Sequence, residues 1–211
     1  MSKTGKVLAQ FNAKNGKYKV AGGSAVASLV WLTKVSLDRD LATQGIYGDG
    51  ELQLNIINDK GYTGTLGVTA RDIDFEKANG MQLEITGGTA EVQQQSILTN
   101  DIYFETEFVG ADGVKKTKKV WLFGVEVGAP SESLEQTTDN LNITTYEYPI
   151  TVKGVYLKAT GGTSDFVDTT TGNKVKVFKL SAVPTDAGYK TFGDTVPVPT
   201  VKTEAGGGGE T

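Results

Sequence analysis

The sequence predicts a mainly β protein with one short flanking α-helix and extended arms. Glycine contributes 27 of the 211 residues, which is nearly twice its usual share of about 7% and favours strands joined by tight turns. Apolar and polar residues alternate in several runs. In residues 51–57, for example, Leu52, Leu54 and Ile56 fall on one face, the pattern of a half-buried strand. Helix signals occur in a single segment.

The length favours one domain with arms. We assign residues 1–24 to an N-terminal arm or strand and residues 25–183 to a β-sandwich or barrel domain. Residues 184–211 are predicted to form an extended C-terminal arm and a flexible Gly-rich tail. The run VPVPTV in this last segment cannot donate regularly to a strand ladder, because proline lacks the amide hydrogen.

The first half of the domain reads as strands around a polar excursion. A strand is predicted at 25–37, with Leu29 and Trp31 on one side, and then a loop at 38–48 that shows no periodicity. The strand at 51–57, a turn at 58–61 and a strand at 62–70 follow.

A helix is predicted over about residues 70–79. Thr69 and Asp72 have the spacing of a capping box, in which the hydroxyl accepts from the third helical amide and the carboxylate reaches back. Ile73 and Ala78 supply a short apolar stripe, and Gly80 stands where a helix C-terminus favours glycine.

The second half continues as strands. These are a strand fragment after Gly80, a hairpin around Asp112-Gly113, a strand over 140–160 with Pro149 as a candidate break, and a hairpin around Gly172-Asn173.

Composition excludes several classes of function. The chain contains no cysteine and no histidine, which removes disulfides, thiolate metal sites and the commonest general base. The net charge of −4 disfavours a nucleic-acid binder. We therefore expect no enzyme, no cofactor and no metal, and a hydrolase built on two carboxylates is a distant third possibility.

The N-terminus has no apolar core of signal-peptide length, and no apolar run approaches the ~18 residues that span a bilayer. We expect a soluble protein that is made and kept in a cytoplasm, with no membrane partner.

Two other motifs have ordinary explanations. Asp38 and Asp40 with Asp49 suggest calcium, but an EF-hand loop needs an acid, a glycine and a glutamate at later positions, where Ala42, Thr43 and Asp49 stand. The basic run at 115–119 is expected to be a solvated hairpin tip.

Five aromatic residues lie in strand-like runs and are expected in the core unless they form an exposed sugar-binding platform: Trp31, Tyr103, Phe104, Trp121 and Phe123.

The order of segments resembles the major tail protein, or tail tube subunit, of long-tailed, siphovirus-type bacteriophages. The resemblance covers roughly residues 25–155. It is carried by GIYGDGELQLNIINDKGYTGTLGVTARDIDFEKANG, a hairpin that leads into one short helix ending in glycine. The later series YFETEF and KKVWLFGVEVGAPSESLEQTTDNLNITTYEYPITVKG follows in the same order.

The resemblance implies a β-sandwich or barrel of the phage tail tube type. Six copies would form a ring, rings would stack helically into a hollow tube, and DNA would pass through it into the host without specific binding. It also implies other phage tail proteins as partners (tape measure, distal tail and terminator), a place in the virion and assembly in the host bacterial cytoplasm.

Under this hypothesis the loop at 38–48 reaches the next ring through Leu41, Gln44, Ile46 and Tyr47; the alternative is an ordinary mobile loop.

Candidate acids facing the channel are Glu51, Glu105 and Glu107, because carboxylates would repel the phosphates of passing DNA within about 8 Å. The alternative function is a β-sandwich binding module that recognises a carbohydrate or a receptor.

Overall fold

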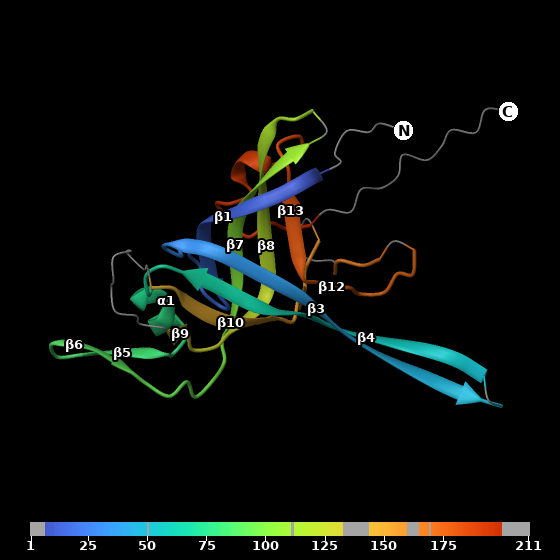
Figure 1. Cartoon of the computed structure of the whole chain (residues 1–211), viewed down its shortest axis with the longest axis horizontal. Coiled ribbons are helices and arrows are strands. Elements are labelled where there is room, and N and C mark those ends of the chain that lie inside the picture. The colour runs from blue at the N-terminus through green and yellow to red at the C-terminus, as the bar shows by residue number, and fades with distance from the viewer. Residues whose placement is uncertain are drawn as a thin grey trace, which may run out of the picture.

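The structure, a computed structural model, describes residues 7–49, 51–110, 112–132, 144–159, 165–168 and 170–199. It is mainly β, with one short α-helix, α1 (Ile73–Ala78), beside one end of the large sheet (Figure 1). The predicted fold class, mainly β with a short flanking helix, is confirmed.

Six long strands build the large sheet: β1 (Val7–Val20), β3 (Leu32–Gly48), β4 (Glu51–Val68), β7 (Thr99–Gly110), β8 (Lys115–Val127) and β10 (Tyr146–Val152). The shorter elements are β2 (Ala27–Ser28), β5 (Gln82–Ile85), β6 (Gly88–Glu91), β9 (Ser131–Glu132), β11 (Val155–Tyr156), β12 (Lys176–Val177), β13 (Lys179–Ala182) and the 3-10 helix η1 (Tyr189–Thr191). The order in the large sheet is β2-β1-β7-β8-β10-β4-β3, and neighbouring strands are antiparallel.

The large sheet curls until its two ends meet. Only residues 29–31 separate β2 at one end from β3 at the other. β1 contacts β3, and the amide of Thr69 after β4 donates to the carbonyl of Trp31 at 3.2 Å. The result is a barrel-like body whose interior is filled by the main core.

Strand β8 is the centre of this body. One of its edges pairs with β7, and its other edge pairs first with β13 and then with β10. The changeover falls at Gly124, whose φ of +61° and nearness to the carbonyl of Gly154 favour glycine.

Side chains of β7 and β8 point alternately into two cores. Ile102 and Leu122 enter the main core with Leu66, while Tyr103 and Trp121 enter a second core on the opposite face. This alternation is the period of a pleated strand that is covered on both sides.

The C-terminal segment supplies the cover of the second core. Residues 184–199, which the sequence predicts as part of an extended arm, fold back on the sheet. The indole nitrogen of Trp121 donates to the carbonyl of Phe192 at 2.7 Å, and Lys17 donates to the carbonyl of Gly193 at 2.7 Å. A buried indole N–H needs a partner, and this segment provides it. The rest of the predicted tail, from residue 200, lies outside the described residues.

Helix α1 ends as expected and begins differently. The amide of Gly80 donates to the backbone carbonyl of Lys77, and the amide of Met81 donates to the backbone carbonyl of Glu76. With φ +70° at Gly80, this is a Schellman motif. The N-cap is Asp72 itself, whose carboxylate accepts from the amide of Phe75 at 3.0 Å. The capping box from Thr69 is therefore wrong: the helix starts three residues later.

Three other expectations about strands are also wrong. The predicted strand at 25–37 is interrupted at Trp31, which has φ +59°, because the chain here crosses from one end of the sheet to the other. The predicted turn at 58–61 lies inside the continuous strand β4. Strand β10 runs through Pro149, whose carbonyl accepts from the amide of Gly128. Proline has no amide hydrogen to donate on this side of β10, and none is needed there, because β8 has already ended.

Candidate assembly interface

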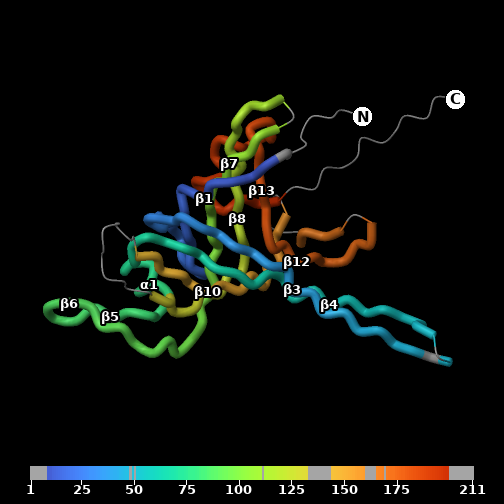
Figure 2. Tube along the Cα trace, in the orientation of Figure 1, coloured from blue at the N-terminus to red at the C-terminus, as the bar shows by residue number. Residues whose placement is uncertain are grey.

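The distal halves of β3 and β4 form a two-stranded projection that leaves the body (Figure 1; Figure 2 shows it as a narrow double strand). We call residues 41–57 the distal hairpin; residue 50 lies outside the described residues. Strand pairing runs from Leu41 opposite Asp59 to Gly48 opposite Glu51. The predicted loop at 38–48 is therefore wrong, because these residues belong to β3.

The distal hairpin exposes an unusual amount of apolar surface. Seven large apolar side chains are 45–72% exposed: Leu41, Ile46, Tyr47, Leu52, Leu54, Ile56 and Ile57. Soluble monomers rarely expose contiguous apolar surface of this kind, and where it occurs it usually marks an interaction site.

A shift in register distributes these side chains over both faces. Ile46 lies opposite Leu54 and Gln44 opposite Ile56, so these residues share a first face. Between Ile46 and Tyr47 the register shifts, because β4 advances by two residues while β3 advances by one.

The second face consequently carries Leu41, Tyr47, Leu52 and Ile57. A Cβ placed on Gly45 would lie 2.8 Å from the Leu52 side chain and 3.1 Å from the Tyr47 ring, which puts these side chains on the side of Gly45. The expectation that Leu52, Leu54 and Ile56 share one face is wrong, and the hairpin is apolar on both sides.

A cluster at its base fixes the projection to the body. The Arg39 guanidinium pairs with Asp59 and lies 4.6 Å from the ring centre of Tyr62 and 4.8 Å from that of Phe178. Only glycine fits at position 61 beside this cluster, since a Cβ there would lie 2.0 Å from the carbonyl oxygen of Val152. The hairpin is thus held in a defined direction where it leaves the body.

Both outer edges of the distal hairpin also lack a strand partner among the described strands. β3 pairs with β4 alone, and β4 pairs with β10 only over Tyr62–Val68. Unpaired edges are templates for strands of another chain. The hairpin can therefore be covered through its faces, its edges or both.

The structure brings the four predicted contact residues together on this projection. Gln44 and Ile46 lie on the first face, and Leu41 and Tyr47 on the second. The apolar residues of β4 that pair with them alternate as in a half-buried strand, which predicts a core face, and yet every residue of 51–60 is exposed in the structure.

The three predicted channel acids do not form one cluster. Glu51 stands at the tip of the distal hairpin, whereas Glu105 and Glu107 lie on β7. Glu105 accepts from Asn15 at 2.7 Å and from the Tyr103 hydroxyl at 2.7 Å. Glu107 pairs with Lys115 at 2.7 Å and with Lys14 at 2.6 Å, so lysines offset its charge.

Glu107 predicts a measurable acid dependence. Hydrogen bonds from Lys115, Lys14 and Asn12 lower its pKa from 4.5 to about 2. The folded chain therefore keeps this carboxylate ionised at a pH where the unfolded chain has taken up the proton. Its stabilising contribution is complete above about pH 4.5 and is lost as the pH falls toward 2.

We expect the free energy of unfolding to fall less steeply between pH 4.5 and 2 in Glu107→Gln than in the natural chain, as measured by denaturant titrations across that range. Glu84→Gln, which removes a 77% exposed carboxylate of β5, is the control. Identical slopes for Glu107→Gln and the natural chain would contradict the prediction.

A second polar cluster is buried under α1 and explains how the helix is attached. The fully buried carboxylate of Glu76 receives two hydrogen bonds from Arg71, both 2.8 Å, and one each from Gln82 and the Tyr148 hydroxyl, both 2.5 Å. Burial and the hydrogen bond to Glu76 raise the pKa of Tyr148. Because this carboxylate is enclosed and hydrogen-bonded from several sides, its geometry suits packing rather than acid–base chemistry.

The expectation that the aromatic residues of strand-like runs lie in the core is confirmed for four of the five, which therefore form no exposed sugar-binding platform. Tyr103, Phe104, Trp121 and Phe123 are buried, and of the five aromatic residues only Trp31 is exposed. No group of three or more metal-ligating side chains occurs in the part of the chain that the structure describes. Within the same part, no helix has the length and apolarity needed to cross a membrane.

Comparison with known proteins gives structural neighbours only. No family model and no curated protein matches the sequence. A chain in the cryo-EM structure of the anti-feeding prophage (AFP) baseplate is similar, with a TM-score of 0.43 and 7% identity over 71% of this chain and 93% of that chain. Hcp1 from Flavobacterium johnsoniae gives a TM-score of 0.32 and 14% identity over 78% of this chain and 100% of that chain. Function is therefore inferred from the distal hairpin.

Proposed function

We propose that the chain is a structural virion protein whose activity is self-assembly, and that it is not an enzyme. In this proposal it forms hexameric rings that stack into the tail tube of a phage, the channel for DNA delivery into the host. The observation that carries the proposal is the projecting distal hairpin with exposed apolar side chains on both faces.

The free energy expected from burying the hairpin supports an assembly in which each subunit makes many contacts. Full burial of one Leu or Ile side chain contributes about 1.5–3 kcal/mol, and the seven exposed side chains of the hairpin are roughly half buried already. Covering them yields on the order of 5–10 kcal/mol, against association costs of about 4–15 kcal/mol. One hairpin contact is therefore close to neutral, and stable association requires a subunit to make several contacts at once.

Symmetry explains how such contacts add up. A contact between two different surfaces of identical subunits closes into a ring or continues as a filament. The resemblance of the sequence to tail tube subunits supports the combination of both, with rings in the plane and a filament along the axis. It also supports the tape measure, distal tail and terminator proteins as partners.

A single charge in the hairpin tests the proposal. Tyr47→Asp places a carboxylate at a side chain that is 72% exposed in the monomer, and burial of this unpaired charge would oppose assembly. We expect polymers of the natural chain in sedimentation runs at concentrations where Tyr47→Asp stays monomeric.

The matched control is Tyr156→Asp, which changes a 58% exposed tyrosine of β11 and should assemble as the natural chain does. Equal assembly of Tyr47→Asp and the natural chain would rule out the distal hairpin as the contact.

A further inference from the structure

The segment between β2 and β3 presents a second apolar surface. Trp31 is 66% exposed, the neighbouring Val30 is 42% exposed, and Ile73 at the start of α1 is 41% exposed. The Val30 amide donates to the Asp72 carboxylate at 3.2 Å, which places this segment beside the beginning of α1. We call Val30, Trp31 and Ile73 the Trp31 surface.

Trp31 has a backbone conformation that a bulky residue rarely adopts. Its φ of +59° lies in the left-handed region, which is unfavourable for any side chain with a Cβ. Backbone hydrogen bonds hold the segment in place: the Leu29 amide donates to Gly16 at 2.8 Å, and the Trp31 carbonyl accepts from Thr69 at 3.2 Å. Strained backbone that its surroundings enforce is concentrated at functional positions.

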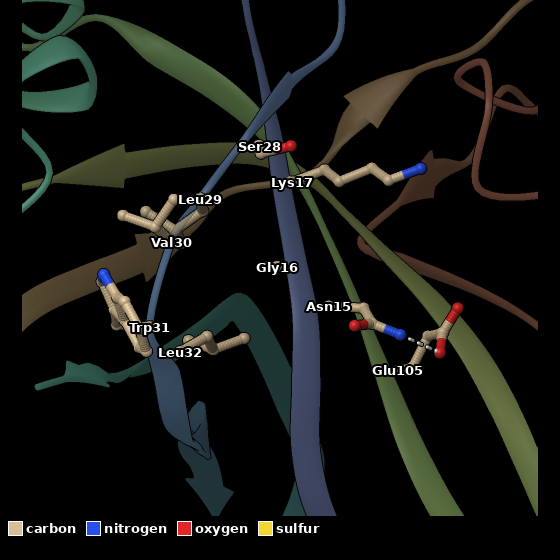
Figure 3. Close-up of a pocket in the computed structure, with 9 residues that line it drawn as sticks. All are labelled: Asn15, Gly16, Lys17, Ser28, Leu29, Val30, Trp31, Leu32 and Glu105. Carbon is tan, nitrogen blue, oxygen red and sulfur yellow. Dashed lines mark hydrogen bonds between the residues drawn. The ribbon is translucent and has the colours of Figure 1, made fainter.

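The Trp31 indole is 66% exposed in this conformation. No aromatic ring or cation of the described residues stacks on it. Figure 3 shows the indole on one side of a groove of about 520 Å³, and Asn15, which donates to Glu105, on the other side. A large exposed tryptophan beside a groove has the character of an interface anchor.

The Trp31 surface and the distal hairpin lie at opposite ends of β3. This strand begins at Leu32, directly after Trp31, and its 17 residues end at the hairpin tip (Figure 1). At about 3.3 Å per residue, the tip of the hairpin lies roughly 50 Å from Trp31 and its nearest residue, Leu41, roughly 30 Å, so the two surfaces cannot meet within one chain.

We propose that the distal hairpin of a second copy of this chain docks on the Trp31 surface. This proposal rests on the assembly proposed above and names the receiving side of the contact. Both surfaces are apolar. The hairpin contributes at most 17 residues, fewer than the ~20–30 per side of a stable interface, so it needs a receiving surface and further contacts on the second copy. The two surfaces differ, so the contact is heterologous and each copy can both receive and donate a hairpin.

Cross-linking tests the pairing directly, because the natural chain contains no cysteine. Cysteines replace exposed residues next to the anchors and leave the anchors in place: Thr43→Cys in the hairpin and Asp74→Cys beside Ile73. Treatment of the assembled double variant with a short bis-maleimide should give a ladder of covalent multimers. A double variant with Thr43→Cys and Lys176→Cys, which lies in β12, is the control and should give none.

Trp31→Gly provides a second, independent measurement. Glycine accepts φ +59° without strain, so the unfolding temperature should stay unchanged or rise. Loss of the indole should raise the concentration needed for assembly by at least about tenfold, the usual effect of removing an anchor tryptophan. Tyr156→Ala should leave that concentration unchanged.

The outcomes separate the two proposals. Polymers without a Thr43–Asp74 ladder, or normal assembly of Trp31→Gly, would overturn docking on the Trp31 surface and leave the assembly proposal intact. Absence of polymers from the natural chain would overturn both.

Discussion

A chain whose distal hairpin has been shortened is expected to fold and to stay monomeric at concentrations where the natural chain polymerises. The shortened chain replaces residues 43–57 with Asn-Gly between Ala42 and Asn58, which face each other in the natural register. A two-residue turn of this type closes antiparallel strands without strain. The main core and the Arg39–Asp59 pair at the base remain.

The expected loss is large because the deletion removes six of the seven exposed apolar side chains of the hairpin. Sedimentation velocity and circular dichroism measure assembly and folding separately. The control is Asn55→Ser, which changes a polar residue of the same hairpin and should not affect assembly. A shortened chain that folds and still polymerises would exclude the hairpin as an assembly element.

Loss of the buried carboxylate of Glu76 is expected to have the largest effect on stability. Glu76→Ala leaves the Arg71 guanidinium without its bidentate partner and removes the acceptor of the Tyr148 hydroxyl. Removal of one partner of a buried ion pair costs about 3–5 kcal/mol. Urea titration at neutral pH measures this change in the free energy of unfolding.

Glu84→Ala serves as the matched control, because Glu84 pairs with Lys77 at 3.1 Å and is 77% exposed. An exposed pair of this kind contributes about 0–1 kcal/mol. If the two variants lost equal stability, the buried cluster would not be what attaches α1 to the sheet.

The sequence predicted features that depend on local chemistry. Gly80 marks the end of α1 because a left-handed residue is needed there, and the Asp112-Gly113 turn joins β7 to β8. The alternation in β7 and β8 follows from burial on two sides. Both Thr69 and Asp72 are good N-caps, so the local pattern does not separate them. The hydrogen bond from the Phe75 amide shows that Asp72 is the cap, and its second bond, from the Val30 amide, joins residues that are distant in the sequence.

The distal hairpin could not be predicted as a strand pair. Periodicity in a sequence indicates a core on one side of a strand, and residues 41–47 are exposed, with no core beside them. The register shift near Tyr47 depends on pairing with β4, which no local pattern encodes. The four candidate contact residues lie on this projection, and their role in contacts between rings stays a prediction.

The packing of residues 184–199 on the sheet could not be predicted for a different reason. The prolines in this segment disfavour a regular strand, but an irregular segment can still pack where buried polar groups need hydrogen-bond partners. Trp121 and Lys17 find theirs on the carbonyls of Phe192 and Gly193. Contacts more than 70 residues apart in the chain decide this arrangement.

Electron microscopy of the purified protein across a concentration series tests self-assembly most directly. We expect hollow rings or tubes above a threshold concentration, and dispersed single molecules of the shortened-hairpin chain at the same concentrations. Dispersed single molecules of the natural chain at every concentration would contradict self-assembly as its activity.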